Sequence, residues 1–201
     1  MPSDKTIIAI CGLGGSGKDT TIQLLFEMVK GGMVHMRDVV EEEIRKRGMP
    51  ITNESLREVA TSMRKELGYD IMAKRSIPHV KKALERHSLV IINSIKDMEE
   101  TELYEKELKE NILLLAVYAS PRTRFERLSR RGLKWDMKDY KSFVWRDMKE
   151  LGWGLGSAIS LADYTIINEG SMKDLKESVS RFLDFVKNTW LSYAGKGEDT
   201  G

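Results

Sequence analysis

A glycine-rich segment near the start of the chain reads Gly12-Leu13-Gly14-Gly15-Ser16-Gly17-Lys18-Asp19-Thr20, and it follows an apolar run at residues 6–11. Four glycines within six positions predict a sharp turn whose backbone approaches a ligand closely. The spacing fits G-x-x-x-x-G-K, in which backbone N–H groups and a helix N-terminus surround phosphate oxygens and the lysine reaches the β- and γ-phosphates. The segment therefore predicts a phosphate-binding loop for a nucleoside triphosphate.

The same residues also fit the dinucleotide-binding pattern G-x-G-x-x-G, through Gly12, Gly14 and Gly17. Asp38 lies about 20 residues further along, where an acid that binds a ribose would fall. Lys18 favours the phosphate-binding loop, because a transferable γ-phosphate needs a cation to offset its developing charge. A glycine-rich turn with a surface lysine and no ligand is a third interpretation of the segment.

The residue after the lysine departs from the commonest form of the motif. Many phosphate-binding loops carry Ser or Thr there, and its hydroxyl contacts Mg²⁺. In this chain Asp19 follows Lys18, and the hydroxyl comes one position later, at Thr20. We expect Thr20 to contact the metal. The G-K-x-T form resembles adenylate kinase and its relatives.

Composition places the chain among ordinary globular proteins. Its 201 residues, 41% hydrophobic and 32% charged, suit one domain. A net charge of +2 from 33 basic and 31 acidic side chains gives no case for nucleic-acid binding. Cys11 is the single cysteine, and the three histidines lack metal-ligand spacing. No signal peptide or membrane-spanning apolar run is visible, so we expect a cytoplasmic protein without membrane contact.

Hydrophobic periodicity predicts an α/β fold in which strands alternate with helices. We expect one domain over residues 1–193, with a helical insertion at 37–67 that covers the acceptor, and a disordered tail at 194–201. The strands are expected at residues 6–11, 33–36, 88–94, 111–118 and 162–167.

Arginines crowd the helix expected after residue 120. Two interpretations remain: a solvated basic helix with acidic partners such as Glu126, or a clamp for polyphosphate. Like charges one turn apart repel by a few tenths of a kcal/mol per pair, and an anion would relieve that repulsion. The phosphate-binding loop favours the clamp for at least two of the arginines. The arginines that crowd this helix are Arg122, Arg124, Arg127, Arg130 and Arg131.

The segment that follows this helix predicts a short cover over the nucleotide. Residues 130–152 would form this lid and would carry Arg146. Three tryptophans are expected to be packing anchors rather than platforms for a base: Trp135, Trp145 and Trp153.

Taken together, the chain resembles nucleoside-monophosphate kinases, and more closely an uncharacterised, mainly archaeal family of P-loop proteins related to adenylate kinase and dephospho-CoA kinase. The resemblance covers nearly the whole chain. The segments that carry it are residues 14–18, 36–40, 119–128, 146–154, 162–164 and 168–171.

The resemblance implies a P-loop NTPase fold of three α/β/α layers, with a five-stranded parallel sheet in the order 2-3-1-4-5. It also implies that the loop and Thr20 hold ATP and Mg²⁺, and that Asn168 and Gly170 lie in a turn beside the adenine. Further residues implied to act on the phosphates are Arg127 and Arg131 where the lid starts, and Arg146 where it ends.

Two positions differ from these kinases. Their third strand usually ends in Asp-Gly, sometimes with an arginine following, whereas this chain reads Asn93-Ser94-Ile95-Lys96. The aspartate that is absent here is expected to help hold Mg²⁺ in those kinases, so its loss removes a metal-supporting carboxylate. In addition, an arginine that adenylate kinases use on the acceptor phosphate is replaced by Glu41. The acceptor or the level of activity would differ accordingly.

The leading hypothesis is an ATP-dependent phosphotransferase that acts on a nucleotide, a nucleoside or a dephospho-CoA-like small molecule, as a monomer or a homodimer. Asp38 would meet the acceptor, and it would serve as general base if the acceptor is a hydroxyl. Lys18 and the arginines would stabilise the transferring phosphoryl group. The alternatives are an ATP-binding regulatory protein with weak or no kinase activity, and a dinucleotide-dependent oxidoreductase.

Overall fold

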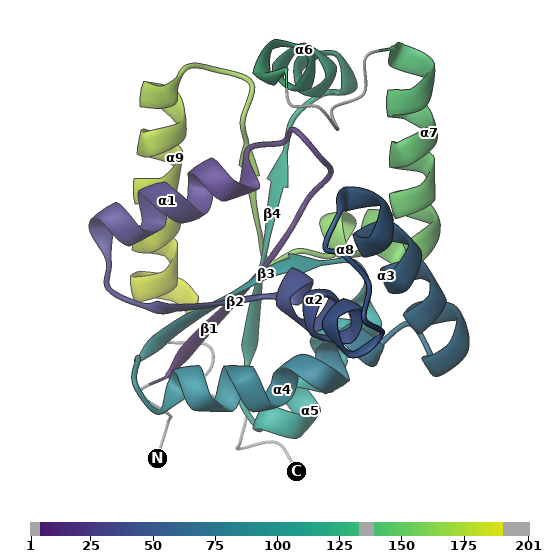
Figure 1. The fold of residues 1–201 in the computed structure, drawn as a ribbon. Helices are drawn as coiled ribbons and strands as arrows, with labels where there is room; N and C mark the ends of the chain where they lie inside the picture. The colour runs from purple at the N-terminus through teal and green to yellow at the C-terminus, as the bar shows by residue number, and fades with distance from the viewer. Residues whose placement is uncertain (1–4, 133–138, 191–201) are drawn as a thin grey trace.

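A twisted parallel sheet forms the centre of the molecule (Figure 1). The computed structural model describes residues 5–132 and 139–190, so the tail expected to be disordered lies outside the described residues. The strand order is β2-β3-β1-β4-β5, which is the order 2-3-1-4-5 that the resemblance implied. The strands are β1 (Thr6–Cys11), β2 (Gly32–His35), β3 (Leu89–Ile95), β4 (Ile112–Tyr118) and β5 (Tyr164–Ile167).

Strand β1 lies in the middle of the sheet, between β3 and β4. Ile7 to Cys11 are fully buried because helices cover both faces of the sheet, which explains the continuous apolar run in the sequence. The register of β1 against β3 shifts after Ile10, which pairs with Asn93, whereas Cys11 pairs with Ile95. The shift leaves Ser94 as an extra residue at the end of β3, with a left-handed φ of 80°.

One helical layer packs on the face of the sheet to which Ile8 and Ile10 point. Leu25 and Phe182 are fully buried there against the strands. The helices of this layer are α1 (Lys18–Met28) and α9 (Met172–Phe185), which continues as a π-helical turn, η2 (Val186–Trp190).

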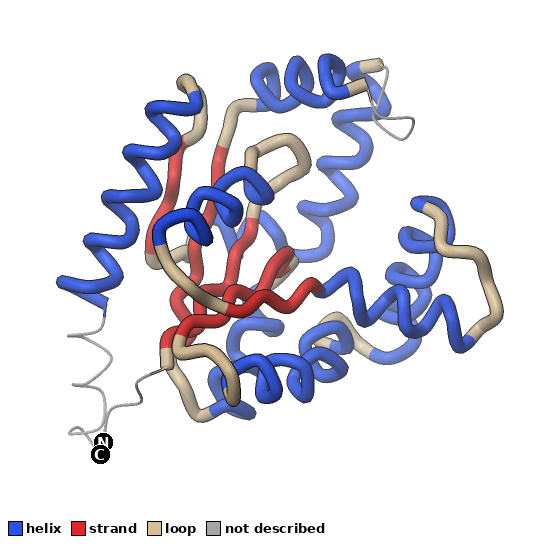
Figure 2. The backbone as a smooth tube through the Cα atoms, turned by 60° about the vertical axis from the view of Figure 1, so that its left-hand side comes forward, coloured by secondary structure: helices blue, strands red, loops and turns tan. Residues whose placement is uncertain are grey.

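A second helical layer covers the opposite face, to which Ile7, Ala9 and Cys11 point. Strand β2 runs directly into the first of these helices, and the strands lie between the two layers in the turned view of Figure 2. The predicted three-layer α/β/α architecture is therefore confirmed. The helices of this layer are α2 (Met36–Lys46), α3 (Asn53–Leu67), α4 (Ile71–Leu84), α5 (Met98–Leu108) and α8 (Gly156–Ser160).

Two helices follow β4 and lie beyond the carboxyl ends of the strands (Figure 1). They are α6 (Pro121–Arg131) and α7 (Tyr140–Glu150), and α7 continues into η1 (Leu151–Leu155), which has a kink at Gly154. Rings of Phe125, Tyr140 and Phe143 join α6 to α7 with centroid separations of 5.3–5.6 Å. These contacts place α7 beside the mouth of the glycine-rich loop. Residues 133–138 of the expected lid, which include the predicted packing anchor Trp135, lie outside the described residues.

Candidate active site

The glycine-rich loop joins the buried end of β1 to the first turn of α1. Gly12, Gly15 and Gly17 have φ values of 144°, 84° and 98°, which L side chains rarely adopt. A Cβ on Gly12 would collide with the backbone carbonyl of Val117. Glycine is therefore required here by both conformation and close packing, and the loop backbone is left open toward a ligand at the N-terminus of α1.

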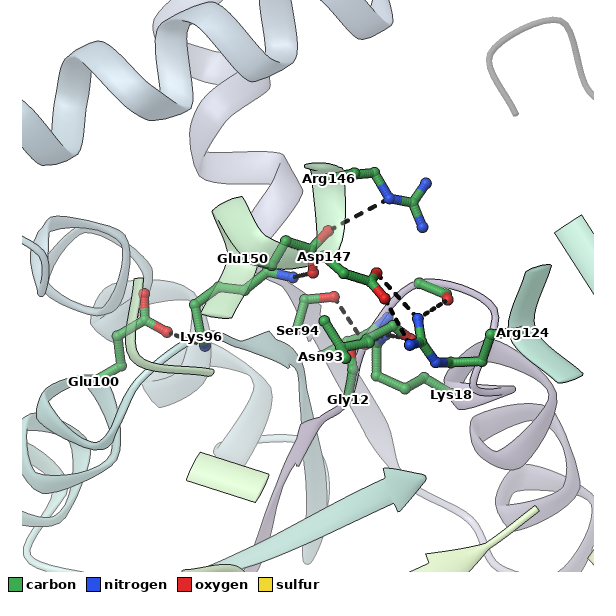
Figure 3. Close-up of polar contacts among 12 residues, drawn as sticks. Gly12, Lys18, Asn93, Ser94, Lys96, Glu100, Arg124, Arg146, Asp147 and Glu150 are labelled. Atoms are coloured by element: carbon green, nitrogen blue, oxygen red, sulfur yellow. Dashed lines mark hydrogen bonds and ion pairs between the residues drawn. The ribbon is translucent and has the colours of Figure 1, made fainter. Parts of the chain in front are cut away.

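The lysine of the loop is folded back onto its own backbone. Lys18 Nζ donates to the carbonyls of Gly12 at 2.6 Å and Leu13 at 3.4 Å (Figure 3). Burial and, to a smaller extent, the ammonium of Lys96 lower the pKa of Lys18 to about 8. Anionic phosphate oxygens at the loop would favour the charged form of Lys18.

A buried ion pair fixes the loop against α7. Arg124 donates to both carboxylate oxygens of Asp147, at 3.0 and 2.6 Å, and to the carbonyls of Gly14 at 3.2 Å and Ala119 at 3.0 Å (Figure 3). Its guanidinium also stacks over the Phe143 ring at 4.9 Å. Arg124 is thus an internal clamp that positions the loop and α7.

Sequence reasoning counted Arg124 among the crowded arginines but assigned it no role of its own. A signal was present, because Arg124 lies one helical turn before Leu128 and shares its apolar face. Both side chains are 2% exposed.

Arg146 covers the phosphate-binding loop from α7. A Cβ on Gly14 would overlap the Arg146 guanidinium, so that glycine permits the close approach. Arg146 Nε lies 4.0 Å from Glu150 and is buried without a hydrogen-bond partner among the described residues. The structure therefore brings a half-buried cation from the expected lid to the loop.

A small pocket of about 230 Å³ gathers five of the predicted site residues: Gly17, Thr20, Arg127, Asn168 and Gly170. Asn168 ties two of its walls together, because it donates to the Ser16 carbonyl at 2.8 Å and accepts from Arg127 at 3.4 Å. The pocket lies between the first turn of α1 and the turn after β5.

Two predicted residues lie apart from this group. Arg131 is exposed at the last residue of α6. Asp38 is exposed on the first turn of α2, where Arg37 rather than Asp38 lines the large cavity described next. Glu41, which stands where an acceptor-binding arginine was expected, pairs with Arg37 at 2.7 Å and with Arg45 at 2.9 Å.

A cavity of about 1150 Å³ lies between α2, α3, α7 and the end of β3. Trp145 is 59% exposed at its edge, so the expectation that it is a packing anchor is wrong. Trp153 also lines the cavity, and the Arg64 guanidinium stacks on its ring at 5.0 Å. The charged lining residues are Arg37, Arg57, Arg64, Lys65, Lys96, Arg146, Lys149, Glu54, Glu58, Glu66 and Glu150.

Lys96 and Glu150 connect this cavity to the phosphate-binding loop. Lys96 Nζ lies 2.8 Å from Glu150 Oε2, and both side chains are less than one fifth exposed (Figure 3). Burial alone would raise the pKa of Glu150, but the ammonium groups of Lys96 and Lys18 and the Arg146 guanidinium lower it. Sequence reasoning missed this pair, because its members are 54 residues apart on different elements.

Behind Lys96, a buried carboxyl group supports the end of β3. Glu100 accepts the Lys96 backbone N–H at 2.8 Å and lies 3.4 Å from Arg64 Nη2. Burial raises the pKa of Glu100 to about 7, although Arg64 opposes the shift. The protein therefore binds a proton at Glu100 well above the pH at which an exposed carboxyl releases it.

Several buried polar atoms around the loop have no hydrogen-bond partner in the described part of the chain. They are Ser16 Oγ, Arg127 Nη1 and Arg146 Nε. A buried unpartnered donor is costly, so such atoms indicate a polar ligand. All three can donate to phosphate oxygens, so the residues present fit a nucleotide polyphosphate. No cluster of three or more His, Cys, Asp or Glu residues suited to a metal occurs within residues 5–132 and 139–190. Mg²⁺ would therefore depend on the nucleotide itself for several of its ligands.

The strand order also decides between the two glycine patterns. In the dinucleotide-binding fold β1 lies beside β2, whereas here β3 separates them. The dinucleotide interpretation is therefore wrong. The sheet, the loop after β1 and Lys18 define a P-loop protein with a kinase-like fold of the kind that binds nucleotides.

Sequence comparison places the chain more narrowly. Residues 8–142 match a family model described as "AAA domain". A UPF0200 protein from Thermococcus sibiricus is 38% identical to this chain, over 89% of this chain and 94% of its own length. A UPF0200 protein from Pyrococcus horikoshii is 35% identical, over 92% of this chain and 99% of its own length. A UPF0200 protein from Methanocaldococcus jannaschii is 33% identical over 93% of both chains. The chain belongs to the UPF0200 family, as the resemblance indicated.

Solved structures show the same fold at low sequence identity. TT1252 from Thermus thermophilus matches with a TM-score of 0.61 and 19% identity, over 90% of this chain and 97% of that one. A shikimate kinase from Bacteroides thetaiotaomicron matches with a TM-score of 0.60 and 14% identity, over 90% and 98%. Among the helices within the described residues, none has the length and apolarity needed to cross a membrane.

Proposed function

We propose that this protein is an ATP-dependent phosphotransferase that moves the γ-phosphate to a nucleotide, a nucleoside or a dephospho-CoA-like acceptor. The observation that carries the proposal is the position of Arg146. This residue covers Gly14 of the phosphate-binding loop and also lines the large cavity. A phosphoryl group passing from the loop to an acceptor in the cavity would cross beside its guanidinium.

The described residues suit the electrostatic demands of phosphoryl transfer. A bond forms between an acceptor oxygen and the γ-phosphorus as the bond to the β,γ-bridging oxygen breaks, and the bonding electrons leave with ADP. Lys18 and Arg146 would offset the charge on the phosphates, and Arg127 with Asn168 would hold the rest of the nucleotide in the small pocket. Mg²⁺, which Thr20 would help to hold, would neutralise further charge when bound.

The lining of the large cavity supports a charged acceptor with a flat ring. Its basic side chains outnumber its carboxylates, and two tryptophans flank it. An acceptor phosphate is already anionic and needs no base, whereas a hydroxyl acceptor would require one. Asp38 is proposed for that role from outside the cavity lining, because it directly follows Arg37, which does line the cavity. In this scheme residues 1–193 form one domain, residues 37–67 cover the acceptor and residues 130–152 form the lid.

Calorimetry of ATP binding, with a coupled kinase assay in parallel, tests the proposal. The acceptor panel comprises nucleosides, nucleoside monophosphates and dephospho-CoA. Lys18→Ala should weaken ATP binding and abolish turnover, because the variant loses a cation that meets the phosphates. Lys30→Ala is the matched control, since Lys30 is exposed beyond the end of α1. If Lys18→Ala binds ATP as tightly as the parent, the assignment of the loop is wrong.

A second candidate is an ATP-binding regulatory protein with weak or no kinase activity, located in the cytoplasm as the kinase would be. Asn93 favours it, because this buried amide stands at the end of β3, where such kinases usually carry a carboxylate. Tight ATP binding without turnover on any acceptor would support the regulator. Turnover that rises with one acceptor would exclude it.

A further inference from the structure

We infer that Asp19 supplies the carboxylate for the nucleotide's Mg²⁺, in place of the carboxylate missing from the end of β3. The inference rests on the proposed binding of ATP at the loop. Asp19 directly follows Lys18, which is the position where many phosphate-binding loops place a side chain that contacts Mg²⁺. Its side chain is exposed on the first turn of α1, so an ion can reach it.

The structure also brings Asp19 to the end of β3. Asn93 Nδ2 donates to Asp19 Oδ1 at 3.4 Å. A carboxylate only accepts hydrogen bonds, so the amide must present its NH₂ group to Asp19. The opposite side of the amide agrees with this orientation, because Asn93 Oδ1 accepts a hydrogen bond from Ser94 Oγ at 3.2 Å. The Asn93 oxygen is therefore engaged with Ser94 and not directed at Asp19.

Charge favours an amide at position 93, whose Nδ2 also lies 3.2 Å from His35 Nδ1. An aspartate there would place a second carboxylate within hydrogen-bond distance of Asp19, where the two like charges would repel. Asparagine keeps the shape of aspartate and replaces repulsion with a hydrogen bond. The carboxylate that related kinases carry at the end of this strand would thus be supplied here from the first turn of α1, one residue before the hydroxyl of Thr20.

The two neighbouring donors suit this metal. Mg²⁺ prefers hard oxygen ligands and is commonly held by one or two carboxylates, by substrate phosphates and by water. Asp19 and Thr20 offer a carboxylate and a hydroxyl oxygen at the N-terminus of α1, beside the loop that would hold the phosphates. A carboxylate at this point also explains how the chain dispenses with the usual acid of β3.

The test measures metal binding and does not depend on turnover. ATP affinity is measured by calorimetry in EDTA, and Mn²⁺ affinity of the ATP complex is measured by electron paramagnetic resonance. Asp19→Asn should bind ATP in EDTA at least as tightly as the parent, whereas its Mn²⁺ affinity should fall about 10–100-fold. The double variant Asp19→Asn/Asn93→Asp returns the carboxylate to the strand and should recover most of the loss. Glu27→Gln, the same change on exposed surface of α1, should change neither affinity.

The outcomes separate this inference from the proposed function. An Asp19→Asn variant that keeps the Mn²⁺ affinity of the parent overturns the role of Asp19 and leaves ATP binding intact. A parent protein that binds no ATP, with or without metal, overturns both. Asp19 is exposed, so its replacement by asparagine should leave the fold intact. ATP binding in EDTA checks this, because only a folded loop would bind the nucleotide.

Discussion

Replacing Asp147 by alanine would test whether the Arg124–Asp147 pair holds α7 over the phosphate-binding loop. The pair is buried, with side-chain exposures of 3% and 10%, and its two hydrogen bonds measure 3.0 and 2.6 Å. Truncating one partner of such a pair leaves an uncompensated buried charge. The substitution therefore removes the main partner of Arg124 while leaving its own contacts with Gly14 and Ala119 in place.

The expected loss of stability follows from these contacts. Breaking a buried ion pair from one side costs about 3–5 kcal/mol. Two carbonyl hydrogen bonds remain to Arg124, so we expect the lower end, about 3 kcal/mol. For a protein of this size the loss lowers the melting temperature by roughly 6–12 °C. Urea denaturation measures the free energy of unfolding, and calorimetry measures the shift in temperature.

A matched substitution on α6 provides the control. Glu126 pairs with Arg122 at 3.2 Å, but these side chains are 46% and 91% exposed. Glu126→Ala should therefore cost less than about 1 kcal/mol. Replacing Arg124 by methionine together with Asp147 by leucine should recover part of the stability, because no charge is then left buried although the Gly14 and Ala119 carbonyls lose their donor. Equal losses from Glu126→Ala and Asp147→Ala would refute the reasoning.

Three further predictions concern the loop and the buried carboxyl group. Burial and Lys96 lower the pKa of Lys18 to about 8, so Lys18 should take up a proton when ATP binds at pH 9. The affinity for ATP should therefore fall as the pH rises above 8. Calorimetry in two buffers measures this uptake, and Lys18→Arg should show none. Glu100 keeps its proton up to about pH 7 in the folded protein and releases it near 4.5 when unfolded. Stability should therefore fall by up to about 3 kcal/mol as pH rises from 4.5 to 7, and Glu100→Gln should flatten that profile in urea denaturation. Gly12→Ala should destabilise the fold, because the new Cβ would collide with the Val117 carbonyl. Gly14→Ala should only displace the Arg146 side chain and weaken ATP binding. Thermal unfolding and ATP titration of both variants distinguish the two effects.

The sheet could be predicted from the sequence because its strands are buried on both faces. Continuous apolar runs at residues 6–11 and 111–118 have no other simple explanation in a globular domain. The glycine spacing located the phosphate-binding loop for a similar reason, since few backbones require so many positive φ values. Helix α1 begins at Lys18, so the lysine of the motif already belongs to the helix into which the loop leads.

The contacts between distant elements could not be predicted in the same way. Arg124 and Asp147 are 23 residues apart on two helices, and no local periodicity relates them. Lys96 follows the last residue of β3 and Glu150 is the last residue of α7, so these two side chains meet because the carboxyl ends of the two elements lie side by side. The exposure of Trp145 likewise depends on where α7 lies, and an apolar ring in a helix otherwise suggests packing.

The phosphate-binding loop is held by residues that lie far downstream in the sequence and are synthesised long after it. Arg124, which binds the Gly14 carbonyl, comes 110 residues later, and Asn168, which binds the Ser16 carbonyl, comes 152 residues later. Strand β1 also needs β3 and β4 as neighbours before it is enclosed. A nascent chain therefore carries the nucleotide-binding motif for most of its synthesis without the parts that shape it. A nucleotide bound at the loop would therefore stabilise the fold only after residue 168 has been synthesised.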